Sequence, residues 1–216
     1  MNHKSKDKTF KHLAIAGNIG SGKTTLATML SKHFHWDLQL EAVDENPYLE
    51  DFYDDMKAWS FHLQVYFLNS RFKQIKKIKL NKKPVIQDRT IYEDAHIFAK
   101  NLHHSKLMSD REYQNYLDLF DSMTSIITPP DLLIYLRANI GTLVSQIEER
   151  GRKYEEKIQI EYLKNLNDHY REWITGYSKG PMIIIDIDNK DFVKNPEDFS
   201  DIVNKIDLEM NGLFTF

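Results

Sequence analysis

Residues 17–24 read GNIGSGKT, and this stretch decides the fold of the chain. It matches the pattern Gly-x4-Gly-Lys-[Ser/Thr], between an apolar segment at 13–16 and a segment with helical spacing at 25–34. A chance match in a chain this long is on the order of one per cent or less at ordinary glycine frequencies, so an ordinary glycine-rich turn is the weaker interpretation. Glycines let successive backbone N–H groups converge on phosphate oxygens at a helix N-terminus. The sequence therefore predicts a phosphate-binding loop.

Several residues of this loop have expected roles. The Lys23 ammonium is expected to reach the terminal phosphates of a nucleotide, and the Thr24 hydroxyl is expected to ligate Mg²⁺. The other residues expected around the phosphates are Gly17, Asn18, Ile19, Gly20, Ser21, Gly22 and Thr25.

Compact apolar runs recur along the chain and predict the strands of a sheet. Besides 13–16, they occupy 38–43, 84–86, 132–136 and 182–187. Their hydrophobicity is continuous rather than alternating, which is typical of strands covered on both faces in a parallel sheet. Helical patterns fill the intervals between them. We therefore expect an α/β fold with a doubly wound sheet of about five parallel strands.

Helix signals are clear in three of these intervals. Ser109 and Glu112 form a capping-box pattern, and 195–196 (Asn-Pro) opens a final helix that Gly212 can close. The interval 46–79 carries one stripe made of Trp59, Leu63, Tyr66, Phe67 and Ser70.

The composition excludes several classes of function. The chain has 216 residues, which suits one domain spanning 1–216. Lys and Arg total 29 against 32 Asp and Glu, a net charge of −3 that disfavours binding to nucleic acid or to an anionic membrane. The absence of Cys excludes disulfides and thiol catalysis. Neither a membrane-spanning run nor a signal segment is indicated, so we expect a cytoplasmic protein.

A basic stretch at 71–83 holds seven Lys or Arg residues and no acidic residue. It fits either a nucleic-acid patch or the solvated end of a long helix. The overall charge favours the solvated helix end, and the charge pattern alone assigns no site here.

Two segments follow strands and are expected at the carboxyl edge of the sheet, where ligands of such folds bind. Within the second run, Glu41 closes the apolar pattern of Leu38 and Leu40 and offers a carboxylate that can accept the proton of an attacking hydroxyl. Asp88 and Arg89 follow the third run. Asp88 offers a carboxylate that can lie beside Mg²⁺, and Arg89 offers a guanidinium that can bind phosphate. Taken singly, Glu41 is better explained as a solvated charge, and a surface ion pair explains Asp88 and Arg89 equally well.

Arg150 and Arg152 flank Gly151 between two helical stretches. This arrangement suits a lid that brings guanidinium groups to a transferred phosphoryl group, although a charged turn between helices has the same pattern. A guanine-reading Asn-Lys-x-Asp motif is missing, because Asp191 follows 189–190 (Asn-Lys) one position too early. A GTPase switch is therefore disfavoured.

Together these motifs resemble the deoxynucleoside kinase family, in particular its bacterial deoxyadenosine/deoxyguanosine kinase type, from 13 to about 192. GNIGSGKT is similar to the family phosphate loop, and EAV at 41–43 resembles its Glu-Pro-Val motif, with Ala42 in place of Pro. WSFHLQVYFLNSR at 59–71 resembles the helix that lines the nucleoside pocket. DRT at 88–90 and RGRKYEE at 150–156 resemble its Glu/Asp-Arg-Ser motif and its lid.

The resemblance implies a P-loop kinase fold with a short arginine-bearing lid at about 149–158, and ATP with Mg²⁺ as ligands. It implies transfer of a phosphoryl group to the 5′-hydroxyl of a deoxynucleoside. Glu41 would be the general base, with Arg89 beside the hydroxyl and the incoming phosphate. Lys23, Arg150 and Arg152 would neutralise the transferring charge, and Thr24 and Asp88 would lie at the metal.

The resemblance also implies the substrate contacts. Tyr53 and Glu155 would hold the sugar 3′-hydroxyl. Gln64, Arg71 and Asp94 would contact the base edge, beside an apolar wall that includes Phe67. The segment 191–192, Asp191 and Phe192, would lie near the nucleotide adenine.

Arg71 and Asp94 suggest an acceptor with a ring nitrogen beside an exocyclic amine, so a purine deoxynucleoside is expected, with deoxycytidine as a further candidate and thymidine poor. Deoxyadenosine is expected ahead of deoxyguanosine because Asn46, after the 41–43 motif, resembles the residue of bacterial deoxyadenosine kinases at that position. A thymidylate or other nucleoside-monophosphate kinase is the alternative enzyme, and a nucleotide-binding protein without chemistry is the non-enzymatic one. A homodimer through helices that include 59–80 and 109–127 is implied. The sequence does not decide between ATP and GTP.

Overall fold

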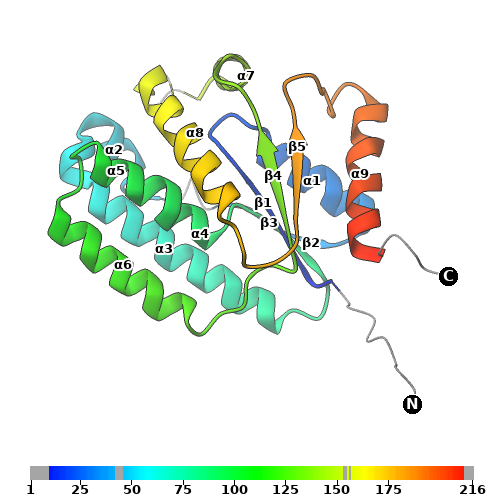
Figure 1. Ribbon diagram of the computed structural model, residues 1–216, viewed down its shortest axis with the longest axis horizontal. Coiled ribbons are helices and arrows are strands. Elements are labelled where there is room, and N and C mark those ends of the chain that lie inside the picture. Colours follow the sequence, from blue (N-terminus) through cyan, green and yellow to red (C-terminus); the bar gives the residue numbers. More distant parts are fainter. Residues whose placement is uncertain (1–9, 42–45, 153–154, 156, 212–216) are drawn as a thin grey trace.

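The computed structural model describes residues 10–41, 46–152, 155 and 157–211 (Figure 1). Five parallel strands form one sheet in the order β2-β3-β1-β4-β5. This arrangement confirms the predicted α/β fold with a five-stranded parallel sheet. The strands are β1 (His12–Gly17), β2 (Asp37–Gln39), β3 (Val85–Asp88), β4 (Leu132–Arg137) and β5 (Met182–Asp186).

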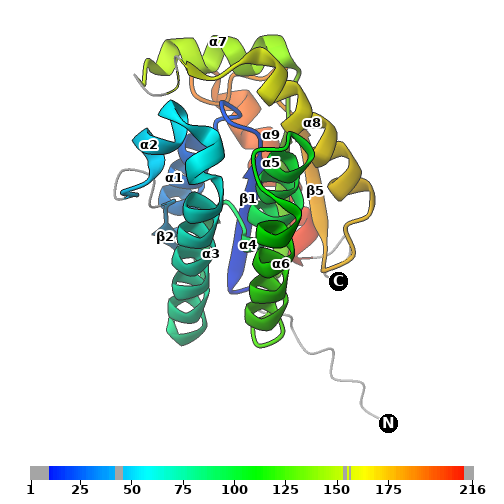
Figure 2. The ribbon, with the colours of Figure 1, turned by 90° about the vertical axis from the view of Figure 1, so that its left-hand side faces the viewer.

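Helices cover both faces of the sheet. In Figure 1, α1 and α9 lie on one side, while α3, α4 and α8 lie on the other. Figure 2 shows α3 and α6 side by side, with α7 across the end of the molecule. The helices are α1 (Lys23–Phe34), α2 (Leu49–Asp54), α3 (Met56–Leu80), α4 (Ile91–Glu93), the π-helical η1 (Asp94–Ala99), α5 (Lys100–His104), α6 (Asp110–Thr124), α7 (Ile140–Arg150), α8 (Ile160–Thr175) and α9 (Pro196–Asn211).

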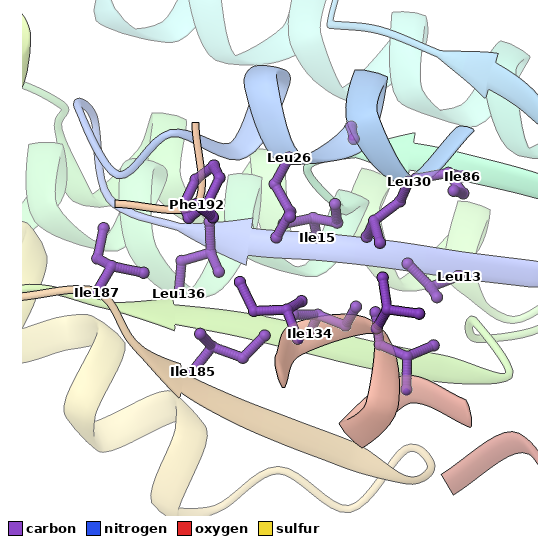
Figure 3. Packing of buried hydrophobic residues seen from close by; sticks show 14 of the residues in the cluster. Leu13, Ile15, Leu26, Leu30, Ile86, Ile134, Leu136, Ile185, Ile187 and Phe192 are labelled. Carbon is purple, nitrogen blue, oxygen red and sulfur yellow. The ribbon is translucent and has the colours of Figure 1, made fainter. Parts of the chain in front are cut away.

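The alternating side chains of β1 explain the two-sided core. Leu13 and Ile15 point to one face and pack with α1 and α9, as Figure 3 shows for part of this cluster. Ala14 and Ala16 point to the other face and pack with α8 and η1. Every residue of β1 is buried, which accounts for its continuous hydrophobicity. Its end at Gly17 therefore has a fixed position at the carboxyl edge.

Two predicted elements differ from the structure. The second strand was expected over 38–43, but β2 ends at Gln39, and residues 42–43 lie outside the described part. Leu40 leaves the strand because its carbonyl oxygen accepts a hydrogen bond from Gln74 Nε2 of α3, at 2.8 Å. The interval 46–79 forms two helices rather than one, because Asp55 caps α3 by accepting a hydrogen bond from the Ala58 N–H.

The buried face of α3 also differs from the predicted stripe. Of the stripe residues only Leu63 is fully buried, and the helix is turned so that polar Gln64, Arg71 and Gln74 point inward. The interpretation of 71–83 as a solvated helix end is confirmed for its lysines and is wrong for Arg71. The physical reason is that this helix packs beside charged groups, which supply the partners that an inward guanidinium needs.

Other expectations for the ends of helices are confirmed. Ser109 and Glu112 form the predicted capping box of α6, and Pro196 opens α9. Gly212, expected to close that helix, lies outside the described residues. Among the described residues, no helix has the length and apolarity to span a membrane.

Candidate active site

The phosphate loop connects β1 to α1 in a glycine-dependent conformation. Gly20 and Gly22 have φ of 83° and 79°, values that side chains rarely adopt. A Cβ on Gly20 would also lie 2.6 Å from the Leu143 carbonyl oxygen of α7. Lys23 is buried at the first position of α1, and its Nζ donates to the Asn18 carbonyl oxygen at 2.8 Å. Burial and the charge of Arg89 lower the pKa of Lys23 to about 7, although the nearby carboxylates act to raise it.

The predicted metal residues lie together. Thr24 Oγ1 donates to Asp88 Oδ2 at 2.5 Å, across the ends of α1 and β3. The other carboxylate oxygen, Asp88 Oδ1, is buried without a hydrogen-bond partner among the described residues. A hydroxyl beside a carboxylate with a free buried oxygen is the hard-oxygen set that Mg²⁺ prefers, so these residues fit the ion.

Glu41, Arg71 and Arg89 form a set that we call the inner cluster, in which both arginines are buried and Glu41 is partly buried. Arg71 Nη2 donates to Glu41 Oε1, and Arg89 Nε lies 3.3 Å from Glu41 Oε2. Burial raises the pKa of Glu41, but the charges of Arg89, Arg71 and Lys23 outweigh it and lower the pKa to about 2. Glu41 is therefore ionised at neutral pH.

The base-edge residues meet on the inner side of this cluster. Arg71 Nε lies 3.3 Å from Asp94 Oδ2 without hydrogen-bond geometry, and Arg71 Nη1 donates to the Asp88 carbonyl oxygen. Three buried atoms consequently lack hydrogen-bond partners among the described residues: Arg71 Nε, Asp94 Oδ2 and Gln64 Oε1. Burial raises the pKa of Asp94 to about 7, although the charge of Arg71 opposes this.

One pocket collects most of the predicted residues. Arg71 does not line it, since its guanidinium lies behind Glu41 and Asp94. The predicted residues that line the pocket are Ile19, Gly20, Lys23, Thr24, Glu41, Tyr53, Gln64, Phe67, Asp88, Arg89, Asp94, Arg150, Arg152 and Glu155.

Other predicted nucleotide contacts point elsewhere. The Asn18 side-chain amide donates to Leu163 and Asn167 of α8, while its Oδ1 accepts the Ile19 N–H, so the side chain holds the loop in place rather than pointing to the phosphates. Phe192 is buried in the core near Gly22, where it supports the loop from below. The Asp191 carboxylate accepts backbone N–H groups of its own turn, including that of Lys194. Thr25 is exposed on α1 and does not line the pocket.

Arg150, Arg152 and Glu155 form a second set, which we call the lid cluster. Glu155 is buried and accepts two hydrogen bonds from Arg150, at 2.7 and 3.0 Å. Arg152 Nη1 lies 3.7 Å from the same carboxylate. Gly151 ends α7 with a φ of 64°, so the chain turns between the two arginines. Residues 153–154 and 156 of the predicted lid lie outside the described part.

Several residues of the site were not predicted from the sequence, including four apolar residues of the pocket wall, Leu40, Leu49, Phe52 and Leu63. Glu93 and Tyr170 are buried beside Arg89, and Phe98 and Tyr162 line the pocket. Glu93 had a readable signal, because Thr90 and Glu93 have the same capping-box spacing as Ser109 and Glu112. The aromatic residues carry no comparable local signal.

Comparisons with known proteins identify the class. The profile of the deoxynucleoside kinase family matches residues 13–210. The chain is 39% identical over 198 residues to the deoxyadenosine/deoxycytidine kinase of Bacillus subtilis (strain 168), with 90% of each protein covered. It is 39% identical over 202 residues to the deoxyguanosine kinase of the same organism, covering 90% of this chain and 95% of that protein. The solved deoxyadenosine kinase from M. mycoides with bound dATP superposes with a TM-score of 0.80 at 32% identity, over 92% of this chain and 99% of that chain.

The chain therefore belongs to the deoxynucleoside kinase family. The resemblance seen in its motifs is confirmed, and so is the P-loop kinase fold that the resemblance implies. The protein is a kinase that phosphorylates deoxynucleosides.

Proposed function

We propose that the protein transfers the γ-phosphoryl group of ATP to the 5′-hydroxyl of a deoxynucleoside and prefers deoxyadenosine. The observation that carries the preference is a pair of buried oxygens without hydrogen-bond partners on described residues that line the pocket, Asp94 Oδ2 and Gln64 Oε1, with the unpartnered Arg71 Nε 3.3 Å from Asp94 Oδ2. An acceptor beside a donor suits an exocyclic amine next to a ring nitrogen, as adenine and cytosine present them. Buried polar atoms that stay unpaired are costly, so a base without that amine is rejected.

In the proposed mechanism Glu41 receives the proton of the 5′-hydroxyl. The O5′–P bond forms as the bond between the γ-phosphorus and the β,γ-bridging oxygen breaks, and ADP leaves. Because the pKa of Glu41 is about 2, its carboxylate first orients the hydroxyl and takes the proton late, once the oxygen has begun to bond to phosphorus. Arg89 holds Glu41 in this orientation and adds positive charge beside the acceptor oxygen.

The donor side is formed by the phosphate loop. Lys23 would exchange its contact with the Asn18 carbonyl for the terminal phosphates, whose charge restores the protonated ammonium. Thr24 and Asp88 would hold Mg²⁺, which neutralises the donor phosphates when bound.

The lid cluster would complete the site on the sugar side. Tyr53 and Glu155 line the pocket and would bind the 3′-hydroxyl, while Arg150 and Arg152 would turn to the transferring phosphoryl group. For this exchange Glu155 must loosen its present contacts with the arginines. The lid, about 149–158, belongs in this proposal to a single domain that spans 1–216.

A nucleoside-monophosphate kinase, such as a thymidylate kinase, is the alternative within the same fold. An ionised Glu41 near the acceptor position would repel an acceptor phosphate, so this alternative is disfavoured. The B. subtilis relatives leave the choice of nucleoside open, because a deoxyadenosine/deoxycytidine kinase and a deoxyguanosine kinase are equally identical to this chain.

A panel of acceptors tests the proposal. We expect kcat/KM to fall from deoxyadenosine to deoxyguanosine, with deoxycytidine measurable and thymidine poor. A thymidine value at or above that for deoxyadenosine contradicts the base-edge assignment. Faster turnover of dTMP than of every nucleoside contradicts the choice of acceptor class, and GTP in place of ATP tests the donor.

We further propose a homodimer through α3 and α6, two helices that lie side by side. Leu119 and Ile126 are exposed apolar residues on and just after α6. Sedimentation equilibrium is expected to give twice the chain mass. A monomer at the concentrations of the assay contradicts this part of the proposal.

A further inference from the structure

Glu93 is a fully buried carboxylate that contacts three parts of the active site. Its Oε1 accepts from the Gly17 N–H at 3.2 Å, at the start of the phosphate loop. The same oxygen lies 3.3 Å from Arg89 Nη1, and Oε2 accepts the Thr90 N–H at 2.7 Å. One side chain therefore joins the donor loop to the arginine beside the acceptor.

Tyr170 of α8 closes the same network from the opposite helix. Its hydroxyl accepts a hydrogen bond from Arg89 Nη1 at 3.0 Å. The hydroxyl oxygen also lies 2.7 Å from both the Gly17 carbonyl oxygen and Glu93 Oε1, so its single proton serves two acceptors. The Phe98 ring packs against the Arg89 guanidinium, whose Cζ lies 4.5 Å from the ring centroid. This contact limits the directions in which the guanidinium N–H groups can point.

Arg89 needs such support because its backbone is in the left-handed region, with a φ of 69°. A residue with a side chain adopts this conformation only when its surroundings hold it there. The backbone N–H of Arg89 donates to the Ile15 carbonyl oxygen of β1, which fixes the main chain but not the guanidinium. The direction of the side chain depends on Glu41, Glu93 and Tyr170.

We propose that Glu93 and Tyr170 are positioning residues, which aim the Arg89 guanidinium at the acceptor oxygen and fix the distance between Arg89 and the phosphate loop. This inference rests on the proposed role of Arg89 in phosphoryl transfer. Neither residue reaches the pocket surface, so neither contacts the substrate directly. Their loss should therefore change kcat while leaving the binding of nucleoside and ATP nearly unchanged.

Tyr170→Phe is the decisive variant, and Tyr135→Phe is its matched control. Tyr135 is buried and stacks on Tyr170 with ring centroids 5.6 Å apart, and its hydroxyl bonds to no described residue. Both variants remove one hydroxyl from the same aromatic pair, but only the Tyr170 hydroxyl contacts Arg89 and Glu93. We expect Tyr170→Phe to lower kcat roughly 10- to 10²-fold, the range that small misplacements produce. Tyr135→Phe should keep the kcat of the wild type.

Glu93→Gln gives an independent test, with Glu112→Gln as its control. Both glutamates occupy the third position of a capping box, but Glu112 is half-buried on α6, and its side-chain hydrogen bonds among the described residues go to Ser109 and not to the active site. Glu93→Gln should lower kcat at least as much as Tyr170→Phe. If it does not fold, as judged by thermal melting, Tyr170→Phe alone decides.

A readout without turnover separates this inference from the proposed function. In ¹⁵N–¹H spectra of arginine side chains, Tyr170→Phe should move or broaden the Arg89 Nε–H signal, whereas Tyr135→Phe should not. An unchanged Arg89 signal, equal kcat losses in both tyrosine variants, or a loss confined to KM would overturn the positioning role. If the wild type phosphorylates no deoxynucleoside while the Arg89 signal responds, the proposed function fails and the structural role of the network stands.

Discussion

The inner cluster and the lid cluster have the same composition, one glutamate between two arginines, but very different surroundings. In the inner cluster the side chains of Arg71 and Arg89 are 2% and 6% exposed. In the lid cluster those of Arg150 and Arg152 are 33% and 35% exposed. The inner cluster has rigid strand ends and a long helix beneath it, whereas the lid cluster follows the end of α7.

This difference determines which contacts can exchange during a reaction cycle. Removing one partner of a buried ion pair typically costs about 3–5 kcal/mol, because the other charge stays buried without compensation. In the lid cluster Glu155 is buried as well, but its two arginines are about one-third exposed, so solvent and salt screen these pairs more than those of the inner cluster. The inner cluster is therefore suited to hold an acceptor in place, and the lid cluster is suited to open, close and give its arginines to phosphate.

The largest expected effect belongs to the inner cluster. Glu41→Gln should lower kcat roughly 10²-fold or more, since it removes the proton acceptor and releases Arg71 and Arg89 from their shared partner. ATP binding, measured by calorimetry, should stay near that of the wild type. Thermal melting controls for the stability that the missing charge costs. Near-normal turnover by the folded variant would contradict the assignment of Glu41.

The lid cluster should give the next largest effect. Arg150→Ala and Arg152→Ala should each lower kcat roughly tenfold or more, with smaller changes in nucleoside KM, because these arginines act on charge that develops late. Arg171→Ala is the control, since Arg171 forms an exposed pair with Asp168 away from the pocket. If the lid variants raise only the nucleoside KM, the lid is a substrate clamp rather than a transition-state element.

The sequence predicts some parts of the site better than others. The phosphate loop and the strand ends are local patterns, so Lys23, Asp88 and Arg89 were readable from short motifs. By its local charge pattern Arg71 looked solvated, because it begins a lysine-rich run; its place at the base edge came only from the family resemblance, and its burial follows from the direction of the helix. The burial of a charge depends on distant segments that bring its partners, which a single sequence does not show.

The two capping boxes make the same point. Ser109 and Glu112 were recognised, while Thr90 and Glu93, with identical spacing, were not. The local pattern was available for both. What makes Glu93 functional is its contact with Gly17 and Tyr170, which are 76 and 77 positions away along the chain. Periodicity predicted the fold because each strand and helix is local, whereas networks of this kind form only after folding.

A smaller effect is the pH dependence of kcat/KM, which tests the role of Asp94 beside the inner cluster. With a pKa of about 7 for Asp94 in the free enzyme, kcat/KM for deoxyadenosine should rise about tenfold between roughly pH 6 and 8 if the ionised carboxylate binds the base. Asp94→Asn should flatten this profile. Saturating ATP keeps Lys23 protonated, so that its own pKa near 7 does not contribute.

The raised pKa of Asp94 and the lowered pKa of Glu41 should change the stability of the fold with pH in opposite directions. The raised pKa of Asp94 favours the folded state at low pH, and this contribution is lost as pH rises from 3.8 toward about 7. The lowered pKa of Glu41 contributes stability above pH 4.5, which is lost as pH falls toward about 2. Melting curves of Asp94→Asn and of Glu41→Gln across these two windows should each lack the corresponding change. A wild-type activity profile that is level between pH 6 and 8 would contradict the role given to ionised Asp94.

The smallest expected effect belongs to the outer edge of the lid. Lys157 pairs with Asp54 at the end of α2, next to Tyr53 of the pocket, and both charged side chains are more than half exposed. An exposed pair of this kind contributes at most about 1 kcal/mol, so Lys157→Ala should raise the nucleoside KM less than about fivefold and leave kcat unchanged. Roughly 0.5 M NaCl, with a Debye length of about 4 Å, should erase the difference from the wild type. Lys164→Ala, which removes a similarly exposed pair with Glu161 on α8, is the control and should show no such change. A much larger or salt-independent increase in KM would mean that this part of the lid is held as firmly as the inner cluster, and the contrast between the two clusters would fail.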